Sequence, residues 1–497
     1  MRWVRIHAIV TFERYVQVFS LINHTETRDH VTPANLAFDF DTLVAASVEC
    51  EVAHPYVDDH HQPFDNPFGD SDLSSAPPSP PPLLISNPST PPPLSLDSSA
   101  LPTASTARPN KRKRRAKAKS HANRKRKRGV AKEVAEYGAY DVRPHVRESI
   151  LHPSESIHTD LRTANIPVCE AGFVAQAGAS SQKTYTLDEL VGARSKFKFN
   201  LVKWDGRESK PIADAKGRVI ALLAGRPPVD PTWDEDISDA ASLIESSRPR
   251  CKFAKPKKGK KNPNRRGKFG ALAAGVSFSG GQEMPGNLTN DERNVEVLAE
   301  LFAHRGFQRM AGFGSAVFAA WLPKLYCYYK DNLATLFTQD PTLERNFLNS
   351  VFPAATVNFG PRTICYKHKD FANLPFGWCT ITALGSFDPT RGGHIILWEC
   401  HLVVEFPPSA TILLPSSVIA HSNTSIGLEE RRYSFIQYAA GGLFQWVSYG
   451  FQKKDPFMES LSPEEALAVH KENAERWKLG LSLFSTLDEI KQPVPAM

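Results

Sequence analysis

The sequence predicts an all-β sandwich or barrel with helices packed outside it, formed by the later part of a 497-residue chain. Two observations predict this class. From about residue 278 the chain carries short runs rich in β-branched and aromatic residues, separated by turn residues and not by helices. Much of the first half is instead proline-rich or basic, with too few large apolar residues for a packed core. We therefore expect a mainly β domain with flanking helices (α+β), preceded by a long, largely disordered N-terminal region.

The first 277 residues divide into three segments by composition. Residues 1–63 contain no assignable chemistry, and residues 64–129 form a Pro/Ser-rich linker that ends in the basic run "KRKRRAKAKSHANRKRKRG". Two basic blocks with a short spacer are typical of a nuclear import signal and can also contact nucleic-acid phosphates; a solvated charge run is the alternative. Residues 130–277 are expected to be semi-ordered, with a small β element over 201–225 and a second basic block over 251–270. A chain that begins near residue 270 is then expected to keep the chemistry.

Cysteine usage and hydropathy predict an intracellular, soluble protein. The seven cysteines show no C-x-x-C spacing, so neither a zinc ribbon nor a disulfide framework is indicated. No stretch has the 18 or so apolar residues that a membrane span needs, and charges at Arg5, Glu13 and Arg14 interrupt the apolar start. We expect no membrane partner.

Residues 278–497 are expected to form the folded domain. A first helix is predicted to start at an N-cap at Asn290 and stop at Gly306, and a second to cover 314–337 with a kink near Pro323. A helix is also expected at the C-terminal end of the domain. The predicted β runs between them are "TVNFG", "RTICYKH", "WCTITALGSF", "GGHIILWECHLVVEF", "SATILLPSS", "IAHSN" and "YSFIQYAAGGLFQWV".

A candidate metal site begins in the stretch "CYKHKDFANLPFGWC", where His368 and Asp370 stand one residue apart. Residues two apart on a strand share a face, so the pair presents an imidazole and a carboxylate together. His421, in "SSVIAHSNTSI", lies at the end of another predicted strand. Two imidazoles and one carboxylate on neighbouring strands can occupy one face of an octahedron around Fe(II), which leaves positions for a co-substrate and dioxygen. A zinc site that uses the nearby thiols Cys365 and Cys379 is the alternative.

A candidate anchor for the co-substrate follows in "LEERRYSFIQYAAGG", where Arg432 and Ser434 form an R-x-S pattern. A guanidinium with a hydroxyl beside it suits the remote carboxylate of a dicarboxylate such as 2-oxoglutarate, because bidentate bonding supplies both charge and orientation. Arg431 is the competing residue. Strand alternation places the two arginines on opposite faces, and the R-x-S pattern favours Arg432 as the one that points inward.

These motifs carry a resemblance to a known family. The segment from about 280 to 452, with "GGQEMPGN", "AGFGSAVFAAWLPKLYCYY", "VVEFPPSATILLPSSVIAHSN" and "RRYSFIQYAAGGLFQWV", resembles the fungal branch of the TET/J-binding-protein family. The resemblance implies a double-stranded β-helix (jelly-roll) and an Fe(II)- and 2-oxoglutarate-dependent dioxygenase that oxidises the methyl group of 5-methylcytosine or thymine in DNA. It also implies iron ligation by His368, Asp370 and His421, and 2-oxoglutarate binding by Arg432 with Ser434.

Base recognition leaves more than one reading open. A base in a duplex must be flipped out to reach an iron centre, and it is then held by stacking and by hydrogen bonds to its Watson–Crick edge. Asn373 has an amide for such bonds and Tyr438 a ring for stacking, but Asn373 could equally fix a turn and Tyr438 fill the core. His394 and His401 are expected to be structural or exposed, and not ligands.

Two other functions fit parts of the sequence. The barrel could hydroxylate RNA, N6-methyladenine or a protein side chain, because a metal triad and a fold do not determine the substrate. Alternatively, the protein could be a chromatin- or transposon-associated DNA-binding factor without catalysis. The complete set of ligand and anchor residues favours the enzyme. We expect a nuclear protein that acts on DNA as a monomer.

Overall fold

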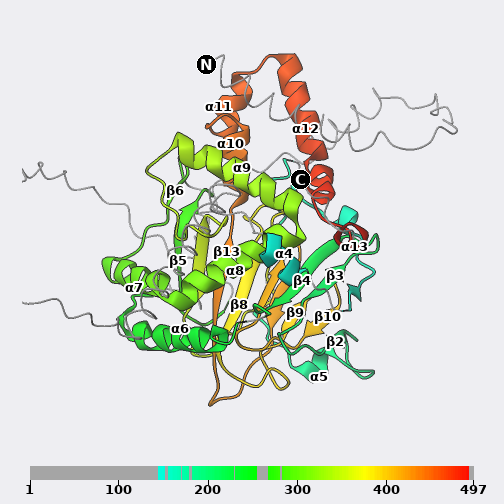
Figure 1. Ribbon diagram of the computed structural model, residues 1–497. Coiled ribbons are helices and arrows are strands. Elements are labelled where there is room, and N and C mark those ends of the chain that lie inside the picture. Colours follow the sequence, from blue (N-terminus) through cyan, green and yellow to red (C-terminus); the bar gives the residue numbers. More distant parts are fainter. Residues whose placement is uncertain are drawn as a thin grey trace, which may run out of the picture. The chain divides into compact units, whose positions relative to one another are not determined.

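Two β-sheets form the centre of the described part of the chain (Figure 1). The computed structural model describes residues 144–151, 155–169, 171–177, 182–228, 230–253, 267–279 and 282–491. Within these residues the larger sheet has nine strands, in the order β1 (Ile157–His158), β3 (Lys210–Ala213), β4 (Val219–Gly225), β11 (Thr411–Leu414), β8 (Cys379–Ser386), β13 (Arg431–Tyr438), β7 (Ala354–Asn358), β5 (Ala271–Ser277) and β6 (Gly286–Asn287). The smaller has four, in the order β12 (His421–Asn423), β9 (Ile395–Leu397), β10 (Leu402–Val404) and β2 (Asn200–Val202).

The path of the chain between the sheets identifies a double-stranded β-helix. After β7 in the larger sheet, His368 bridges to β12 of the smaller sheet, and the chain returns to the larger sheet as β8. It crosses again for β9 and β10, returns as β11, crosses as β12 and returns as β13. The strands of this core pair antiparallel. The fold class predicted from the sequence, a jelly-roll with flanking helices, is confirmed.

Strand β13 is buried on both of its faces. Tyr433 and Phe435 pack into the main apolar cluster under the helices, together with Phe302 and Phe307. The alternate positions of the strand therefore face the other way, into the space between the sheets. The inner face of β13 carries the polar residues Arg432 and Ser434, both buried.

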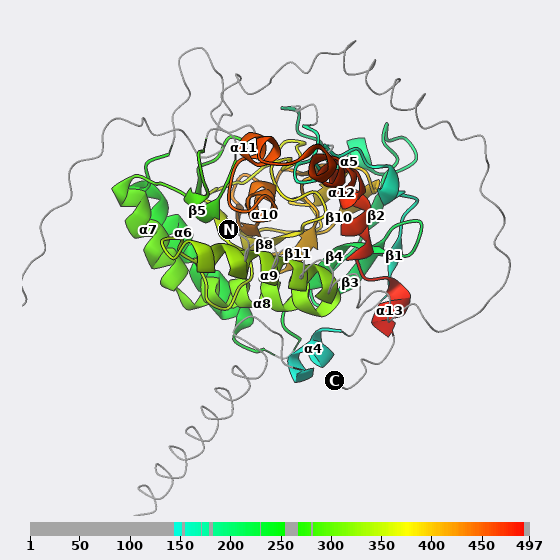
Figure 2. The same cartoon turned by 90° about the horizontal axis from the view of Figure 1, so that it is seen from above.

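Helices cover the outer face of the larger sheet (Figure 2). The four that do so are α6 (Trp233–Ser247), α7 (Glu292–Ala303), α8 (Arg305–Trp321) and α9 (Pro323–Gln339). The remaining helical segments of the described chain are α4 (Pro144–Ile150), η2 (Thr163–Asn165), α5 (Leu187–Leu190), η3 (Arg248–Arg250), α10 (Gly441–Ser448), α11 (Lys454–Glu459), α12 (Pro463–Ser482) and α13 (Leu487–Lys491). The helix expected near the C-terminal end is present as α12. No helix among the described residues is long and apolar enough to cross a membrane.

Helix boundaries differ from the sequence prediction at three places. Asp291, and not Asn290, caps α7, because its side chain accepts a hydrogen bond from the backbone N–H of Arg293. Gly306 does not end a helix but lies in the first turn of α8, where a Cβ atom would stand 2.4 Å from the carbonyl oxygen of Asp236. Pro323 starts a separate helix because its missing N–H is not needed at that position.

The last predicted β run is strand only in its first part. Strand β13 ends at Tyr438, and "GGLFQWVS" forms helix α10. Gly441 allows the close packing at this transition, because a Cβ atom there would stand 1.7 Å from the carbonyl oxygen of Phe173.

The region expected to be semi-ordered, 130–277, contributes strands to both sheets. Strand β4 lies between β3 and β11 and is buried along its whole length, β5 pairs with β7, and β2 pairs with β10. The domain boundary expected after residue 277 therefore falls at the end of β5, a strand of the larger sheet. The β element predicted over 201–225 comprises the end of β2 together with β3 and β4. The segments 1–63 and 64–129, and residues 254–266 of the second basic block, lie outside the described residues.

Candidate metal and dicarboxylate site

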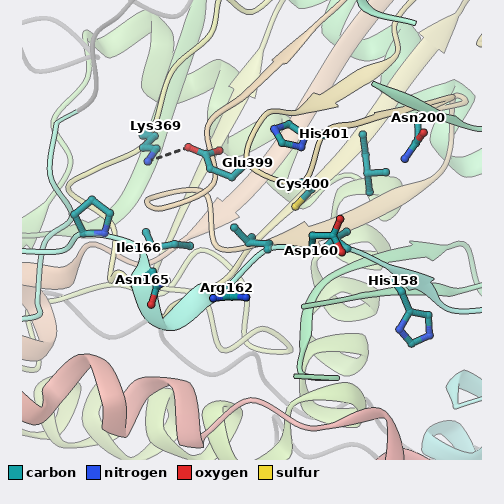
Figure 3. Close-up of a pocket in the computed structure, with 14 residues that line it drawn as sticks. His158, Asp160, Arg162, Asn165, Ile166, Asn200, Lys369, Glu399, Cys400 and His401 are labelled. Carbon is teal, nitrogen blue, oxygen red and sulfur yellow. Dashed lines mark ion pairs between the residues drawn. The ribbon is translucent and has the colours of Figure 1, made fainter. Parts of the chain in front are cut away.

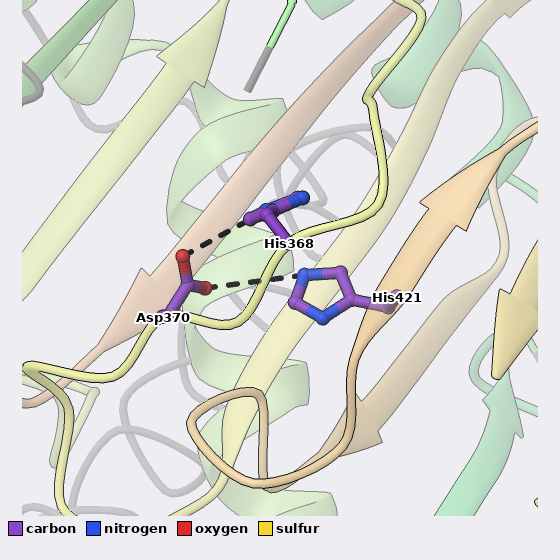
Figure 4. A group of neighbouring side chains, drawn as sticks. All are labelled: His368, Asp370 and His421. Atoms are coloured by element: carbon purple, nitrogen blue, oxygen red, sulfur yellow. Dashed lines mark ion pairs between the residues drawn. The ribbon is translucent and has the colours of Figure 1, made fainter. Parts of the chain in front are cut away.

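Three of the predicted site residues meet between the sheets. The backbones of His368 and His421 bond to each other in both directions, at N···O distances of 3.1 and 3.0 Å, and their rings lie 4.3 Å apart. Asp370 lies in the turn that follows, where its backbone N–H donates a hydrogen bond to the carbonyl of Ser416. Its carboxylate faces both rings, with Oδ1 3.7 Å from Nε2 of His368 and Oδ2 4.0 Å from Nε2 of His421 (Figure 4). The three ligand atoms all lie within 4.8 Å of one another.

Hydrogen bonds on the far side of each ring orient the Nε2 atoms toward Asp370. Nδ1 of His368 lies 2.7 Å from the carbonyl oxygen of Tyr366, and Nδ1 of His421 lies 3.1 Å from that of Ile419. A carbonyl oxygen only accepts, so Nδ1 is the protonated donor in both rings. In the neutral imidazoles Nε2 then carries a lone pair, which is the arrangement that metal-binding histidines adopt.

The donor set fits a divalent cation. All three side chains are less than 9% exposed, and burying a carboxylate opposite two lone pairs is unfavourable unless a positive charge compensates it. Two neutral imidazoles and one carboxylate leave coordination positions open, as non-haem Fe(II) sites do. Neither Cys365 nor Cys379 belongs to the cluster, so the zinc alternative has no thiolate ligand here.

Arg432 is buried and Arg431 is exposed, as the alternation of β13 requires. Arg432 is 4% exposed, and the hydrogen bond of its guanidinium within the described structure runs from Nη1 to the carbonyl of Thr363, at 3.4 Å. Its Nε has no partner, and no Asp or Glu of the described residues pairs with it. Arg431 instead bonds through Nη1 to the carbonyl of Glu430 at the surface.

The surroundings of the Arg432 guanidinium favour an anionic ligand. Burial lowers the pKa of this group, and the proximity of Cys365 opposes the shift. The rings of Phe387 and Phe406 lie 5.7 and 5.8 Å from its central carbon. A buried cation without a carboxylate partner is costly, and a carboxylate supplied by a ligand would compensate it.

Ser434 lies two residues beyond Arg432 on the same face of β13. Its Oγ accepts a hydrogen bond of 2.8 Å from Nδ2 of Asn358, on the neighbouring strand β7, and its own O–H can still donate. Two further hydroxyls nearby have no partner in the described structure, those of Thr356 on β7 and of Thr363. Thr356, Asn358 and Thr363 could not be predicted from the sequence, because only the pairing of β7 with β13 and the contact of residue 363 with Arg432 bring them to the site.

The two candidate base-contacting residues are placed differently. Asn373 closes the turn after Asp370 through a backbone bond to the Asp370 carbonyl, and its Nδ2 donates to Oγ of Ser416. Asn373 therefore fixes the turn after Asp370, and its side chain is partly buried. Tyr438 is 9% exposed and shares the inner face of β13 with Arg432.

His394 and His401 stand outside the cluster. His394 is fully buried, its Nδ1 lies 2.9 Å from Oγ1 of Thr424, and burial lowers its pKa against the opposing effect of Asp388. His401 is exposed and packs beside the ring of Phe199.

A cavity of about 510 Å³, lined by both polar and apolar side chains, lies behind the segment that carries the ligands (Figure 3). It is lined by Lys369 but by neither His368 nor Asp370, because alternate residues of an extended segment point to opposite sides. Glu399 also lines it and pairs with Lys369 at 3.0 Å. This cavity is separate from the candidate metal site.

The fold and the site together define a double-stranded β-helix with a His-x-Asp…His cluster and a buried arginine on its inner face. No family model and no curated protein matches the chain. Solved structures with some similarity include NgTET1 in complex with 5mC DNA, at 14% identity over 56% of this chain and 92% of that one, with a TM-score of 0.34. Another is a 2OG-Fe(II) oxygenase family oxidoreductase from Burkholderia pseudomallei, at 16% identity over 40% of this chain and 78% of that one, with a TM-score of 0.23.

Proposed function

We propose that the chain is an Fe(II)- and 2-oxoglutarate-dependent dioxygenase that oxidises the methyl group of 5-methylcytosine or thymine in DNA. One observation carries the enzyme class: a buried His-Asp-His cluster shares the interior of the barrel with a buried arginine that has no carboxylate partner among the described residues. The first arrangement suits a divalent cation and the second suits a dicarboxylate, and this class of enzyme needs both.

Each protein group has a separate task in this proposal. His368, Asp370 and His421 would hold the iron through Nε2, a carboxylate oxygen and Nε2. Arg432, with the hydroxyl of Ser434 beside it, would bind the remote carboxylate of 2-oxoglutarate. Iron held there would supply, with 2-oxoglutarate and O2 as co-substrates, the oxidation of a substrate C–H bond to C–OH, with release of succinate and CO2.

The surrounding strands orient these groups and keep water out. The apolar rings of Phe387 and Phe406 near Arg432 exclude solvent from the co-substrate carboxylate, which strengthens its ion pair with the guanidinium. The hydrogen bonds from Nδ1 of each histidine to a backbone carbonyl hold the rings before any ligand arrives.

The DNA substrate rests on the resemblance of the segment 280–452 to the TET/J-binding-protein family. A methylated base would have to be flipped into the barrel, with Tyr438 available for stacking and Asn373 for contact with the base edge. The basic tract 111–129 supports nuclear entry and salt-sensitive contact with DNA phosphates. The same site on another substrate, such as RNA, N6-methyladenine or a protein, is the second candidate.

An assay for succinate release tests the proposal. Purified full-length protein is incubated with Fe(II), 2-oxoglutarate and O2 and with oligonucleotides that contain cytosine or 5-methylcytosine, and the bases are identified by mass spectrometry. Succinate that depends on 5-methylcytosine, with hydroxymethyl, formyl or carboxyl products, supports the proposal. Succinate release without base oxidation would refute the substrate, and absence of both would favour a non-catalytic DNA-binding factor.

A further inference from the structure

Two adjacent residues, Trp398 and Glu399, hold both ligand-bearing segments from the side opposite the candidate metal site. They lie in the turn between β9 and β10, and we call them the Trp398–Glu399 clamp. No part of the proposed chemistry uses them directly. Their contacts involve the residues on either side of each of the two histidine ligands.

The clamp bonds to both neighbours of His421. The backbone N–H of Trp398 donates to the carbonyl of Ala420 at 3.0 Å, and its indole Nε1–H donates to Oγ of Ser422 at 3.0 Å. Glu399 accepts the backbone N–H of Ala420 on Oε2 at 2.6 Å. The strand on both sides of His421 is therefore held by the same dipeptide.

The clamp also contacts both neighbours of His368. The ammonium of Lys367 lies over the indole ring of Trp398, 4.2 Å from its centre. The ammonium of Lys369 pairs with Oε1 of Glu399 at 3.0 Å, an interaction drawn in Figure 3. Since side chains alternate along an extended segment, both lysines point away from the face that His368 presents to Asp370.

The residues that make these contacts are largely buried. Trp398 is 6% exposed and packs among aromatic rings, with Tyr185, Phe197 and Phe199 at centroid distances of 4.9, 5.2 and 5.5 Å. The side chains of Lys369 and Glu399 are only 18% and 25% exposed, so their attraction is less screened than that of a surface pair. The clamp is thus a rigid support.

We propose that the Trp398–Glu399 clamp is a positioning device that holds the two backbone segments flanking His368 and His421 in place behind their ladder pair and thereby tunes metal affinity. This inference rests on the proposed metal site. Groups that orient metal ligands from behind typically change metal affinity tenfold or more when they are removed. Here the support acts through the backbone neighbours of the ligands, and the expected loss is about tenfold, at the lower end of that range.

The test compares Glu399→Ala with a matched variant, Glu489→Ala. Glu489 also accepts a lysine ammonium and a backbone N–H, from Lys324 at 2.8 Å and from Thr486 at 2.9 Å, but at α13 and not at the site. Affinity of the metal-free full chain for Mn²⁺ is measured by calorimetry, and the visible spectrum of bound Co²⁺ reports the coordination geometry. We expect about tenfold weaker Mn²⁺ binding and an altered Co²⁺ spectrum for Glu399→Ala, and neither change for Glu489→Ala.

Milder variants keep the test decisive should Glu399→Ala fold poorly. Glu399→Gln retains an acceptor for the N–H of Ala420 and loses only the pair with Lys369, and Lys369→Met removes the same pair from the other side. Both should weaken Mn²⁺ binding less than Glu399→Ala does. Affinities within twofold of wild type for all three, with unchanged Co²⁺ spectra, would overturn the proposal. If the wild type binds no Mn²⁺, or His421→Ala binds it equally well, the assignment of the metal site is wrong. The role proposed for the clamp is then refuted as well.

Discussion

His368 and His421 are joined by two backbone hydrogen bonds, so the separation of their imidazoles is set by a β-ladder and not by flexible side chains. Opposed residues of an antiparallel pair place their side chains on the same face. The carboxylate of Asp370 then completes the cluster from the turn that follows. A site built this way is organised before metal arrives, and substitutions in its side chains should affect function more than folding.

The first prediction concerns the ligands. His368→Ala or Asp370→Ala should abolish succinate formation and weaken Mn²⁺ binding at least a hundredfold, because each removes one of three ligands. Thermal unfolding of the metal-free protein should change little. His401→Ala, which removes an exposed histidine outside the cluster, serves as the control and should remain active. Decarboxylation of 2-oxoglutarate by either ligand variant would rule out the assignment.

The second prediction separates two adjacent arginines. Removing a buried guanidinium from its carboxylate typically costs about 3–5 kcal/mol, whereas losing an exposed ion pair costs about 1 kcal/mol or less. Arg432→Ala should therefore raise the 2-oxoglutarate concentration for half-maximal rate at least about a hundredfold, and Arg431→Ala only a few-fold. Metal affinity should be unchanged in both. A larger defect in Arg431→Ala would contradict the inward role of Arg432.

The third prediction concerns Gly385, which pairs with Arg432 across β8 and β13. Its φ is +111°, and a Cβ atom there would stand 2.3 Å from the carbonyl oxygen of Arg431. Gly385→Ala should therefore displace β13 at Arg431 and Arg432. The expected results are a loss of about 1–3 kcal/mol in unfolding free energy and a higher 2-oxoglutarate concentration for half-maximal rate.

Gly286→Ala is the matched control for this substitution. A Cβ atom at Gly286 would approach no atom closer than 3.9 Å, so its effect should stay within about 0.5 kcal/mol. Chemical denaturation measures both variants. Equal stability of the two would show that β13 accommodates the methyl group without shifting Arg432.

The fourth prediction reverses an expectation drawn from the sequence, that a chain beginning near residue 270 keeps the chemistry. Such a chain lacks β4, whose removal would uncover the edge of β11, and α6, which packs in the main core. It should be insoluble or lack a cooperative unfolding transition, since an uncovered strand edge and an exposed core favour aggregation. A chain that begins at residue 142 should fold. A soluble, cooperatively unfolding chain from residue 270 would refute this.

The sequence by itself determined the parts of this protein that depend on local pattern. Alternation and turn residues predicted most of the core strands, and the spacing of His368 and Asp370 placed two donors on one face. The R-x-S pattern identified Arg432 as the inward arginine of its strand, and the structure buries it and exposes Arg431. Such features follow from the two-residue period of a strand, which is visible in a few adjacent residues.

Only the tertiary structure decided which distant segments share a sheet. Strands β2, β4 and β5 join β10, β11 and β7 across long stretches of chain, and no periodicity encodes that pairing. The Trp398–Glu399 clamp and the contact of Thr363 with Arg432 are of the same kind. Each of these contacts joins groups that the crossing of the chain between the two sheets brings together. The contacts can therefore form and stabilise the protein only when the whole barrel has closed.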